Sequence, residues 1–211
     1  MKTVSASKNR LFRCLCASII FGAMTLVGGV ARVHAQTSPH SGSYYIGSVG
    51  DGGLAVQFTY DTYYNDHQYL SGAYKAALTP FPNNYQVWYI NETGSGNEAY
   101  IEALGPFEGP GSLDALQATS DTYWNGNGYV NGVDNVAITT NTLAPYQLWD
   151  ILPAPNNTWT LLNVGTGMAM QATYEEYFND YQYLYNCRNV CMINWPYVAN
   201  NPFAQWVIQS S

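Results

Sequence analysis

The sequence predicts an all-β fold, because one segment recurs three times and because each copy consists of short apolar runs between turn residues. The recurring segment covers fourteen residues and begins at Gln57, Gln117 and Gln171. The copies align without gaps at a spacing of roughly 57 residues, a period typical of an array of one supersecondary unit. Five positions are identical in all copies: Gln57, Gln117 and Gln171; Thr59, Thr119 and Thr173; Tyr63, Tyr123 and Tyr177; Asn65, Asn125 and Asn179; Tyr69, Tyr129 and Tyr183.

Each copy contains four runs that read as strands, because they are rich in β-branched and aromatic residues and are bounded by Gly, Asn, Asp or Pro. Twelve short strands are therefore predicted, and closing them into a barrel capped by hairpins would leave no free sheet edges. The runs cover residues 43–49, 54–59, 74–79 and 85–90 in the first copy; 99–104, 114–119, 135–140 and 146–151 in the second; and 158–164, 168–173, 189–194 and 204–209 in the third.

Three further positions keep their chemistry in all copies. One carries an acid, one carries an aromatic residue, and one, later in the copy, carries a tryptophan that we expect in the core. In chain order they are Asp61, Asp121 and Glu175; Tyr64, Trp124 and Phe178; Trp88, Trp149 and Trp206.

The first residues resemble an export signal. Basic residues at positions 2, 8, 10 and 13 precede an apolar stretch over about 16–30, and small residues occur before Gln36. We interpret 1–35 as a signal peptide, 36–42 as a flexible lead and 43–211 as a single domain, with repeats at about 43–98, 99–157 and 158–211. A retained anchor is the weaker reading, since the apolar stretch is near the lower limit for spanning a bilayer. The expected location is secreted or periplasmic.

Removal of the signal leaves a strongly acidic chain. Five of the seven basic residues lie in it, so two basic residues face fourteen acids and the formal charge is -12. Such a surface repels phosphate backbones and anionic lipid headgroups, which argues against nucleic acid and membrane partners.

Two motifs resemble the ricin B-type lectins: the segment Gly165–Gln171, of the form G-x-G-x-A-x-Q, and the Q-x-W pattern at Gln86–Trp88 and Gln147–Trp149. The resemblance covers essentially all of the mature chain. It implies a β-trefoil, in which three repeats surround a pseudo-threefold axis and the three tryptophans meet near that axis. The third copy departs from the pattern, since Ala204 takes the place of the glutamine.

The sugar-binding positions of that family are not matched. Glutamine (57, 117 and 171) takes the place of its Asp, and Tyr85, Tyr146 and Phe203 take the place of its Asn. The position of its stacking aromatic falls near Thr79, Thr139 and Asn194. Any sugar binding must therefore use other groups.

An insertion in each copy supplies aromatic, amide and carboxylate side chains, which together suit a sugar ring and its hydroxyls. Up to three weak sites are therefore expected, and linking them would raise avidity. The alternative is that the same residues only pack the loop, with Tyr63, Tyr123 and Tyr177 beneath it. The candidate carbohydrate-binding residues are Gln57, Asp61, Tyr64, Asn65, Gln117, Asp121, Trp124, Asn125, Gln171, Glu175, Phe178 and Asn179.

Cys187 and Cys191 are expected to form a local disulfide in an oxidising compartment, with two free thiols as the alternative. No metal site or cofactor is predicted, although acids and amides of the inserts leave calcium as a minor alternative. No catalytic motif occurs, and His67 next to Asp66 reads as a solvated loop residue, so we expect no enzyme.

Two functions remain open. The first is a secreted, non-catalytic, lectin-like protein that binds a glycan or polysaccharide. The second is a protein that acts through protein contact, as a hydrolase inhibitor or effector, with exposed aromatics as anchors. Shallow concavities lined by the repeated residues would favour sugar, and a long apolar loop projecting from one insert would favour a protein partner.

Overall fold

The structure is a computed structural model of the 211-residue chain. It describes residues 37–64, 69–80, 82–104, 114–124, 129–178, 183–195, 198 and 200–211. These residues belong to one compact unit that spans 35–211. The predicted signal peptide lies outside the described residues, so it stays a prediction.

The described residues form twelve strands and no α-helix, which confirms the all-β fold class. The strands are β1 (Gly42–Ser48), β2 (Leu54–Tyr64), β3 (Tyr69–Pro80), β4 (Val87–Glu92), β5 (Glu98–Ala103), β6 (Asp114–Trp124), β7 (Tyr129–Thr140), β8 (Leu148–Ala154), β9 (Thr158–Asn163), β10 (Met168–Phe178), β11 (Tyr183–Asn194) and β12 (Trp206–Ser210).

Six of the strands pair in a closed ring. The antiparallel order is β1, β4, β5, β8, β9 and β12, and β12 pairs again with β1. Closure of the ring satisfies the backbone groups that an open sheet would expose at its edges.

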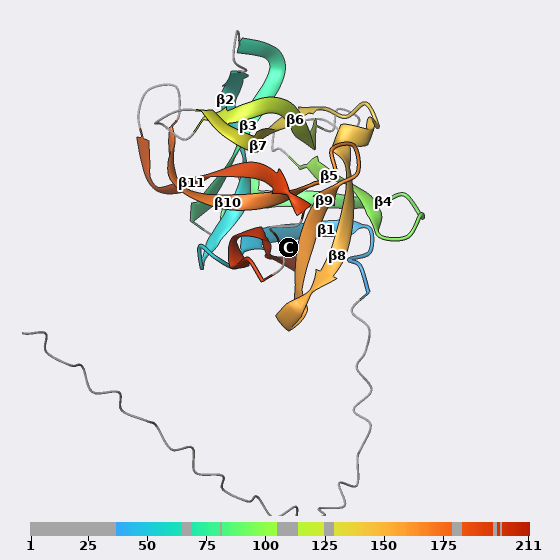
Figure 1. Ribbon diagram of the computed structural model, residues 1–211. Helices are drawn as coiled ribbons and strands as arrows, with labels where there is room; N and C mark the ends of the chain where they lie inside the picture. Colours follow the sequence, from blue (N-terminus) through green and yellow to red (C-terminus); the bar gives the residue numbers. More distant parts are fainter. Residues whose placement is uncertain are drawn as a thin grey trace, which may run out of the picture. The chain divides into compact units, whose positions relative to one another are not determined.

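The other six strands form three hairpins, β2–β3, β6–β7 and β10–β11. The hairpins also pair with one another in a cycle, because β3 pairs with β7, β7 with β11 and β11 with β3. In Figure 1 the labelled hairpin strands lie toward the upper left and the strands of the ring toward the lower right. Each hairpin therefore contacts both of the others.

The sequence suggested that the inserts of the repeat are loops, but strand structure continues into them. Strand β2 continues to Tyr64, well beyond the predicted end at residue 59. The pairing of each hairpin shifts register near a residue with positive φ, namely Gly72 (74°), Gly132 (75°) and Asn186 (61°). Such a β-bulge lets pairing resume after the shift, and glycine adopts this conformation without strain.

The three tryptophans of the repeat are fully buried in one core cluster. Each indole Nε1 donates to a backbone carbonyl of its own copy: Trp88 to Val56 at 2.8 Å, Trp149 to Leu116 at 2.9 Å and Trp206 to Met170 at 3.1 Å. These bonds satisfy the polar end of each ring, as burial requires.

A short 3₁₀ turn precedes each tryptophan, and in the first two copies the glutamine of the Q-x-W pattern supports it. Gln86, at the end of η1 (Asn84–Gln86), is fully buried; its Oε1 accepts from the Asn83 N–H at 2.8 Å and its Nε2 donates to the Thr79 carbonyl at 2.9 Å. In the third copy Ala204 ends the corresponding turn η5 (Pro202–Ala204), so these side-chain bonds are missing there.

The predicted disulfide is wrong, because Cys187 and Cys191 are free thiols. Both lie on the extended strand β11, where four residues span about 13 Å, far beyond the reach of a disulfide. Cys187 packs with Ala77 and Tyr177, whereas Cys191 packs in another cluster with Tyr123. The two thiols therefore fill separate small spaces beneath two tyrosines.

Part of the predicted flexible lead is held against the domain. Ser41 N–H donates to Glu92 Oε2 at 3.2 Å, and Ser41 Oγ accepts from the Glu92 N–H at 3.0 Å. Ser38 Oγ donates to the Ile151 carbonyl at 3.3 Å.

Candidate functional site

The repeated tyrosines and acids join each hairpin to the next. Each tyrosine hydroxyl donates to the acid of the following copy, and the third copy donates to the first. The bonds run from Tyr63 to Asp121 Oδ2 at 2.9 Å, from Tyr123 to Glu175 Oε2 at 3.4 Å and from Tyr177 to Asp61 Oδ2 at 2.7 Å. We call these six side chains the tyrosine-acid ring.

The repeated threonines take part in the same contacts. The Tyr63 hydroxyl lies 3.4 Å from Thr119 Oγ1, and the equivalent distances from Tyr123 to Thr173 and from Tyr177 to Thr59 are 3.5 and 3.2 Å. The identity of Tyr and Thr in all copies thus has a structural cause, since they form the contacts between copies. For these positions the packing interpretation holds.

Burial changes the acid-base chemistry of the ring. Tyr63 and Tyr123 are 4% and 5% exposed. Burial raises the pKa of both phenols far above their ordinary value, because the phenolate would lose its hydration; hydrogen bonding with Thr119 and Thr173 opposes the rise, and the neighbouring acids add to it. The phenols therefore act as neutral donors.

The repeated glutamines are also bound within the fold. Gln57 Oε1 accepts from Thr79 Oγ1 at 2.6 Å and from Asn83 Nδ2 at 2.7 Å. Gln117 Oε1 accepts from Thr139 Oγ1, and Gln171 Oε1 accepts from Asn201 Nδ2, both at 2.7 Å. In each case the amide oxygen is used. Thr79 and Thr139 lie in the same hairpin as their glutamine, whereas Asn83 and Asn201 precede the 3₁₀ turns η1 and η5.

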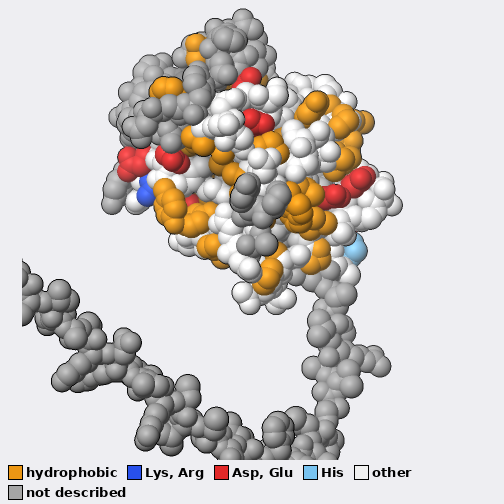
Figure 2. Space-filling model, in the orientation of Figure 1, with side chains coloured by type: hydrophobic (Ala, Val, Ile, Leu, Met, Phe, Trp, Pro, Cys, Tyr) orange, Lys and Arg blue, Asp and Glu red, His pale blue; other side chains and the backbone are white. Residues whose placement is uncertain are grey.

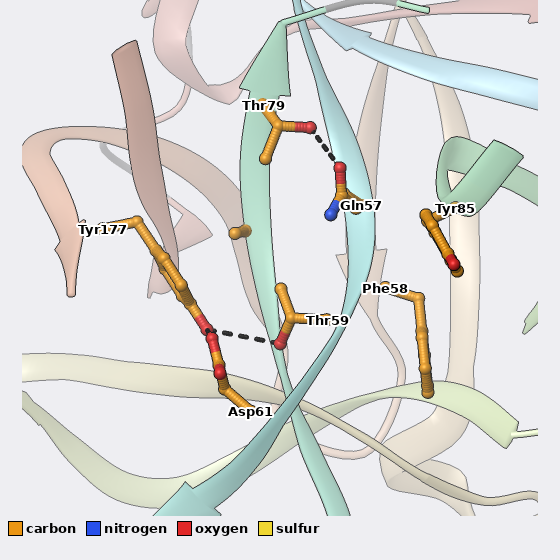
Figure 3. Close-up of a pocket in the computed structure, with 8 residues that line it drawn as sticks. Gln57, Phe58, Thr59, Asp61, Thr79, Tyr85 and Tyr177 are labelled. Carbon is orange, nitrogen blue, oxygen red and sulfur yellow. Dashed lines mark hydrogen bonds between the residues drawn. The ribbon is translucent and has the colours of Figure 1, made fainter. Parts of the chain in front are cut away.

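A pocket of about 230 Å³ lies beside the glutamine of the first copy. Gln57, Phe58, Asp61, Tyr85 and Tyr177 are among the residues that line it. Figure 3 shows the Tyr177 hydroxyl next to the Asp61 carboxylate, and Tyr85 and Phe58 together at the opposite end. The volume is below the usual range for drug-sized ligands, so the pocket fits one small unit.

The predicted site residues do not form one cluster. Gln57 and Asp61 line the pocket, but Tyr64 and Trp124 lie at the ends of their hairpins, where they are 48% and 52% exposed. Phe178 holds the equivalent place in β10, opposite Tyr183, and its side chain lies outside the described residues. Asn65, Asn125 and Asn179 also lie outside the described residues.

Sequence reasoning missed Tyr85 as a member of the site. It stood out only as a departure from the lectin pattern, yet it lines the pocket of the first copy. The recurrence of an aromatic residue at Tyr85, Tyr146 and Phe203 was the signal that could have found it. Tyr146 is 48% exposed, and the Phe203 ring lies 4.4 Å from the ring of Tyr174.

The surface mixes apolar and acidic groups. Figure 2 shows exposed hydrophobic side chains over much of the face in view, with acidic side chains between them and a small basic patch at one edge. Lys75 Nζ lies 6.0 Å from the centroid of the Tyr177 ring, a cation-π contact.

Among the residues that the structure describes, no group of three or more His, Cys, Asp or Glu side chains is placed to hold a metal ion. Within the same residues, none of the helices has the length and apolar character needed to cross a membrane.

The fold resembles several solved structures. A designed threefold-symmetric protein, ThreeFoil, is 14% identical, with a TM-score of 0.53 over 80% of this chain and 99% of its own. A Caenorhabditis elegans protein of unknown function is 10% identical, with a TM-score of 0.62 over 84% and 98%. A Polyporus squamosus lectin, solved with a human-type influenza-binding epitope, is 14% identical, with a TM-score of 0.52 over 82% and 50%.

No protein-family model matches the chain, and no curated protein matches it in sequence. At identities this low the structural likeness concerns the fold alone. It supports a fold of the β-trefoil type.

Proposed function

We propose that the chain is a β-trefoil of three four-stranded repeats about a pseudo-threefold axis, related to the ricin B-type lectins, and that it binds carbohydrate without catalysis after export. The cyclic pairing of the hairpins and the tyrosine-acid ring support the threefold arrangement. A lectin among the proteins of similar fold supports the choice of ligand.

The pocket beside Gln57 is the observation that carries the function. A pyranose needs an apolar surface for its C–H face and polar groups for its hydroxyls. Phe58 and Tyr85 supply aromatic surface, and Gln57 and Asp61 supply the polar groups. In the described part of the chain, the bonds to Gln57 use its oxygen and the bond to Asp61 uses Oδ2, which leaves the Gln57 Nε2 group and Asp61 Oδ1 for a ligand.

The equivalent places in the other copies differ in ways that affect affinity. The second copy keeps Gln117, Asp121, Thr139 and Tyr146. The third copy carries Ile193 in place of the threonine and Phe203 in place of the tyrosine, so it offers fewer hydrogen-bonding groups. The first two copies are therefore the stronger candidates, and weak binding at two places would gain from a branched ligand.

A glycan array with the secreted chain tests this proposal. Tyr85→Ala should reduce retention on the glycans that the wild type binds by about tenfold or more, because it removes the aromatic surface of the pocket. Tyr89→Ala, an outward-facing tyrosine of β4, is the matched control and should retain binding. Equal binding by wild type and Tyr85→Ala would overturn the proposed pocket, and an array without any retained glycan would overturn sugar binding.

Protein contact is the second candidate, and the exposed hairpin aromatics favour it. Tyr64 and Trp124 project at two hairpin ends, and large exposed aromatics commonly anchor protein partners. Changing Tyr64, Trp124 and Phe178 together to Ala separates the two functions. Loss of glycan retention would place sugar at the hairpin ends, whereas unchanged retention would leave these residues to a partner protein.

Export is part of the proposal and has its own test. The amino terminus of the protein recovered from the medium or periplasm should begin near Gln36. An intact Met1 on the exported protein would contradict the signal peptide.

A further inference from the structure

A second pocket, of about 470 Å³, lies where the first and third copies meet. Asp51, Gly52 and Gly53 from the turn between β1 and β2 line it, as do Asn186 and Arg188 from β11. The two sides adjoin because Arg188 of β11 pairs with Leu78 of β3. Its volume lies within the usual range for small-molecule sites.

The polar side chains of this pocket are specific to one junction. At the bulge position of the three hairpins the chain carries Gly72, Gly132 and Asn186. Two residues later it carries Tyr74, Asp134 and Arg188, which occupy the same register against β2, β6 and β10. At these two positions only the third copy carries an amide and a guanidinium. Asn186 has a positive φ, a conformation that glycine adopts without strain.

Arg188 has unused hydrogen-bonding capacity in the described structure. Its Nη1 donates to the Cys187 carbonyl at 3.4 Å and lies 3.8 Å from Glu176 Oε1, beyond hydrogen-bond length. A guanidinium carries five N–H donors in a planar fork that matches a carboxylate. A ligand carboxylate could thus accept hydrogen bonds from Arg188 N–H groups that make only long contacts with the described residues.

Asp51 supplies the opposite charge. Its Oδ2 is buried and has no hydrogen-bond partner among the described residues, an arrangement that is costly unless a donor fills it. Burial raises the pKa of Asp51, and the positive charge of Arg188 opposes the rise, which places the two groups within electrostatic reach of each other. The pocket thus offers a cation and an acceptor to one ligand.

Open space at the turn leaves room for that ligand. A Cβ atom added at Gly52 or Gly53 would meet nothing within 4 Å. By contrast, a Cβ at Gly50 would come within 2.5 Å of the Phe203 ring, so that glycine is required for packing. Gly52 therefore borders open space that a larger side chain could fill, whereas Gly53 has a φ of 99°, a conformation that favours glycine.

We propose that this pocket binds an acidic sugar unit, a uronic acid, whose carboxylate pairs with Arg188 and whose hydroxyls reach Asp51 and Asn186. The inference rests on the proposed carbohydrate function. It adds that one ligand is negatively charged and that this ligand binds at a site separate from the pocket beside Gln57. The formal charge of -12 expected after removal of residues 1–35 disfavours anions at long range, so the local guanidinium must provide the recognition. Asp51 faces the hydroxyl side of the ring because a second carboxylate beside that of the ligand would repel it.

Titration of the full secreted chain with glucuronic acid, galacturonic acid and neutral galactose, followed by ligand-observed NMR, tests the proposal. Arg188→Gln should weaken uronic acid binding about tenfold or more and leave galactose binding unchanged, since a charge-assisted pair is lost. Gly52→Leu, which fills the open space, should block uronic acid as well. Glu176→Gln is the matched control, because it removes the ion-pair partner of Arg188 outside the pocket and should not weaken binding.

The outcomes separate this inference from the proposed function. Uronic acid binding that survives both Arg188→Gln and Gly52→Leu overturns the second pocket, as does a wild type that binds galactose but neither uronic acid. A wild type that binds none of the three sugars overturns this inference, and the glycan array decides the proposed carbohydrate function separately. Loss of uronic acid binding in Tyr85→Ala, with Arg188→Gln unaffected, would assign the acid to the first pocket and also overturn this inference.

Discussion

The hydroxyl of Tyr177 donates a 2.7 Å hydrogen bond to Oδ2 of Asp61, a residue 116 positions earlier in the chain. The bond joins the third hairpin to the first and closes the tyrosine-acid ring. Because Tyr177 is 2% exposed, water does not replace this donor. The contact therefore contributes to the docking of hairpins that are far apart in sequence.

Tyr177→Phe should lower the free energy of unfolding by about 1–3 kcal/mol, since it leaves Asp61 Oδ2 without the donor that Tyr177 supplies, whereas Thr59 keeps its bond to the Lys75 carbonyl. Urea denaturation followed by tryptophan fluorescence would measure the change. Tyr174→Phe is the control, since Tyr174 is 73% exposed and the new ring keeps the contact with Phe203. An equal effect of both substitutions would show that the ring bond does not stabilise the fold.

Truncation of a core tryptophan should be far more costly. Trp149→Ala removes a fully buried side chain and its bond to the Leu116 carbonyl, so we expect a loss of about 3–5 kcal/mol in the free energy of unfolding. Trp124→Ala, at an exposed hairpin end, should cost less than about 1 kcal/mol. Denaturant melts of the two variants at one pH compare them directly, and similar losses would contradict the assignment of core and surface.

The raised phenol pKa values predict a loss of stability at high pH. The pKa of Tyr63 and Tyr123 is higher in the folded chain than in the unfolded chain, so both states are protonated below about pH 10 and this stabilisation is fully present there. Above about pH 10 the unfolded chain releases these protons first, and stability should fall by about 1.4 kcal/mol per pH unit for each phenol. Unfolding free energies measured from pH 9 to 11.5 check this slope.

The Tyr63→Phe and Tyr123→Phe double variant is the control for the slope, because it cannot ionise at either position. Its stability should fall less steeply above pH 10 than that of the wild type. Parallel curves would mean that other groups cause the alkaline loss.

The two cysteines should behave as protected free thiols. Burial raises the pKa of Cys187 and of Cys191, which lowers the thiolate fraction that reacts. The exported chain should therefore react with a thiol reagent slowly when folded and at two sites in denaturant without reductant. A mass two units lower that is restored by reduction would show an internal disulfide and contradict the free thiols.

Several features of this protein followed from the order of residues. The gap-free repeat predicted recurring strands, and apolar runs bounded by turn residues predicted an all-β fold, because both signals are local in sequence. Burial of Trp88, Trp149 and Trp206 also followed from a pattern, since large aromatic residues at fixed places in a repeat usually fill a core.

The same signals failed at the inserts and the cysteines. The run after Thr59 contains turn residues, so its continuation as strand across a bulge could not be seen locally. The spacing of Cys187 and Cys191 fits a small loop as well as a strand, and only the extended backbone of β11 decides against the bridge.

The sequence by itself determined the segment that recurs three times, the strand content and the tryptophans of the core, since each of these signals is local in sequence. The tertiary structure decided what the repeated polar residues do. Tyr63 reaches Asp121 and Tyr177 reaches Asp61 only because the hairpins pair in a cycle. It also brought Asp51 and Arg188, which lie far apart in sequence, to one pocket. Contacts between distant residues depend on topology, which no local pattern encodes.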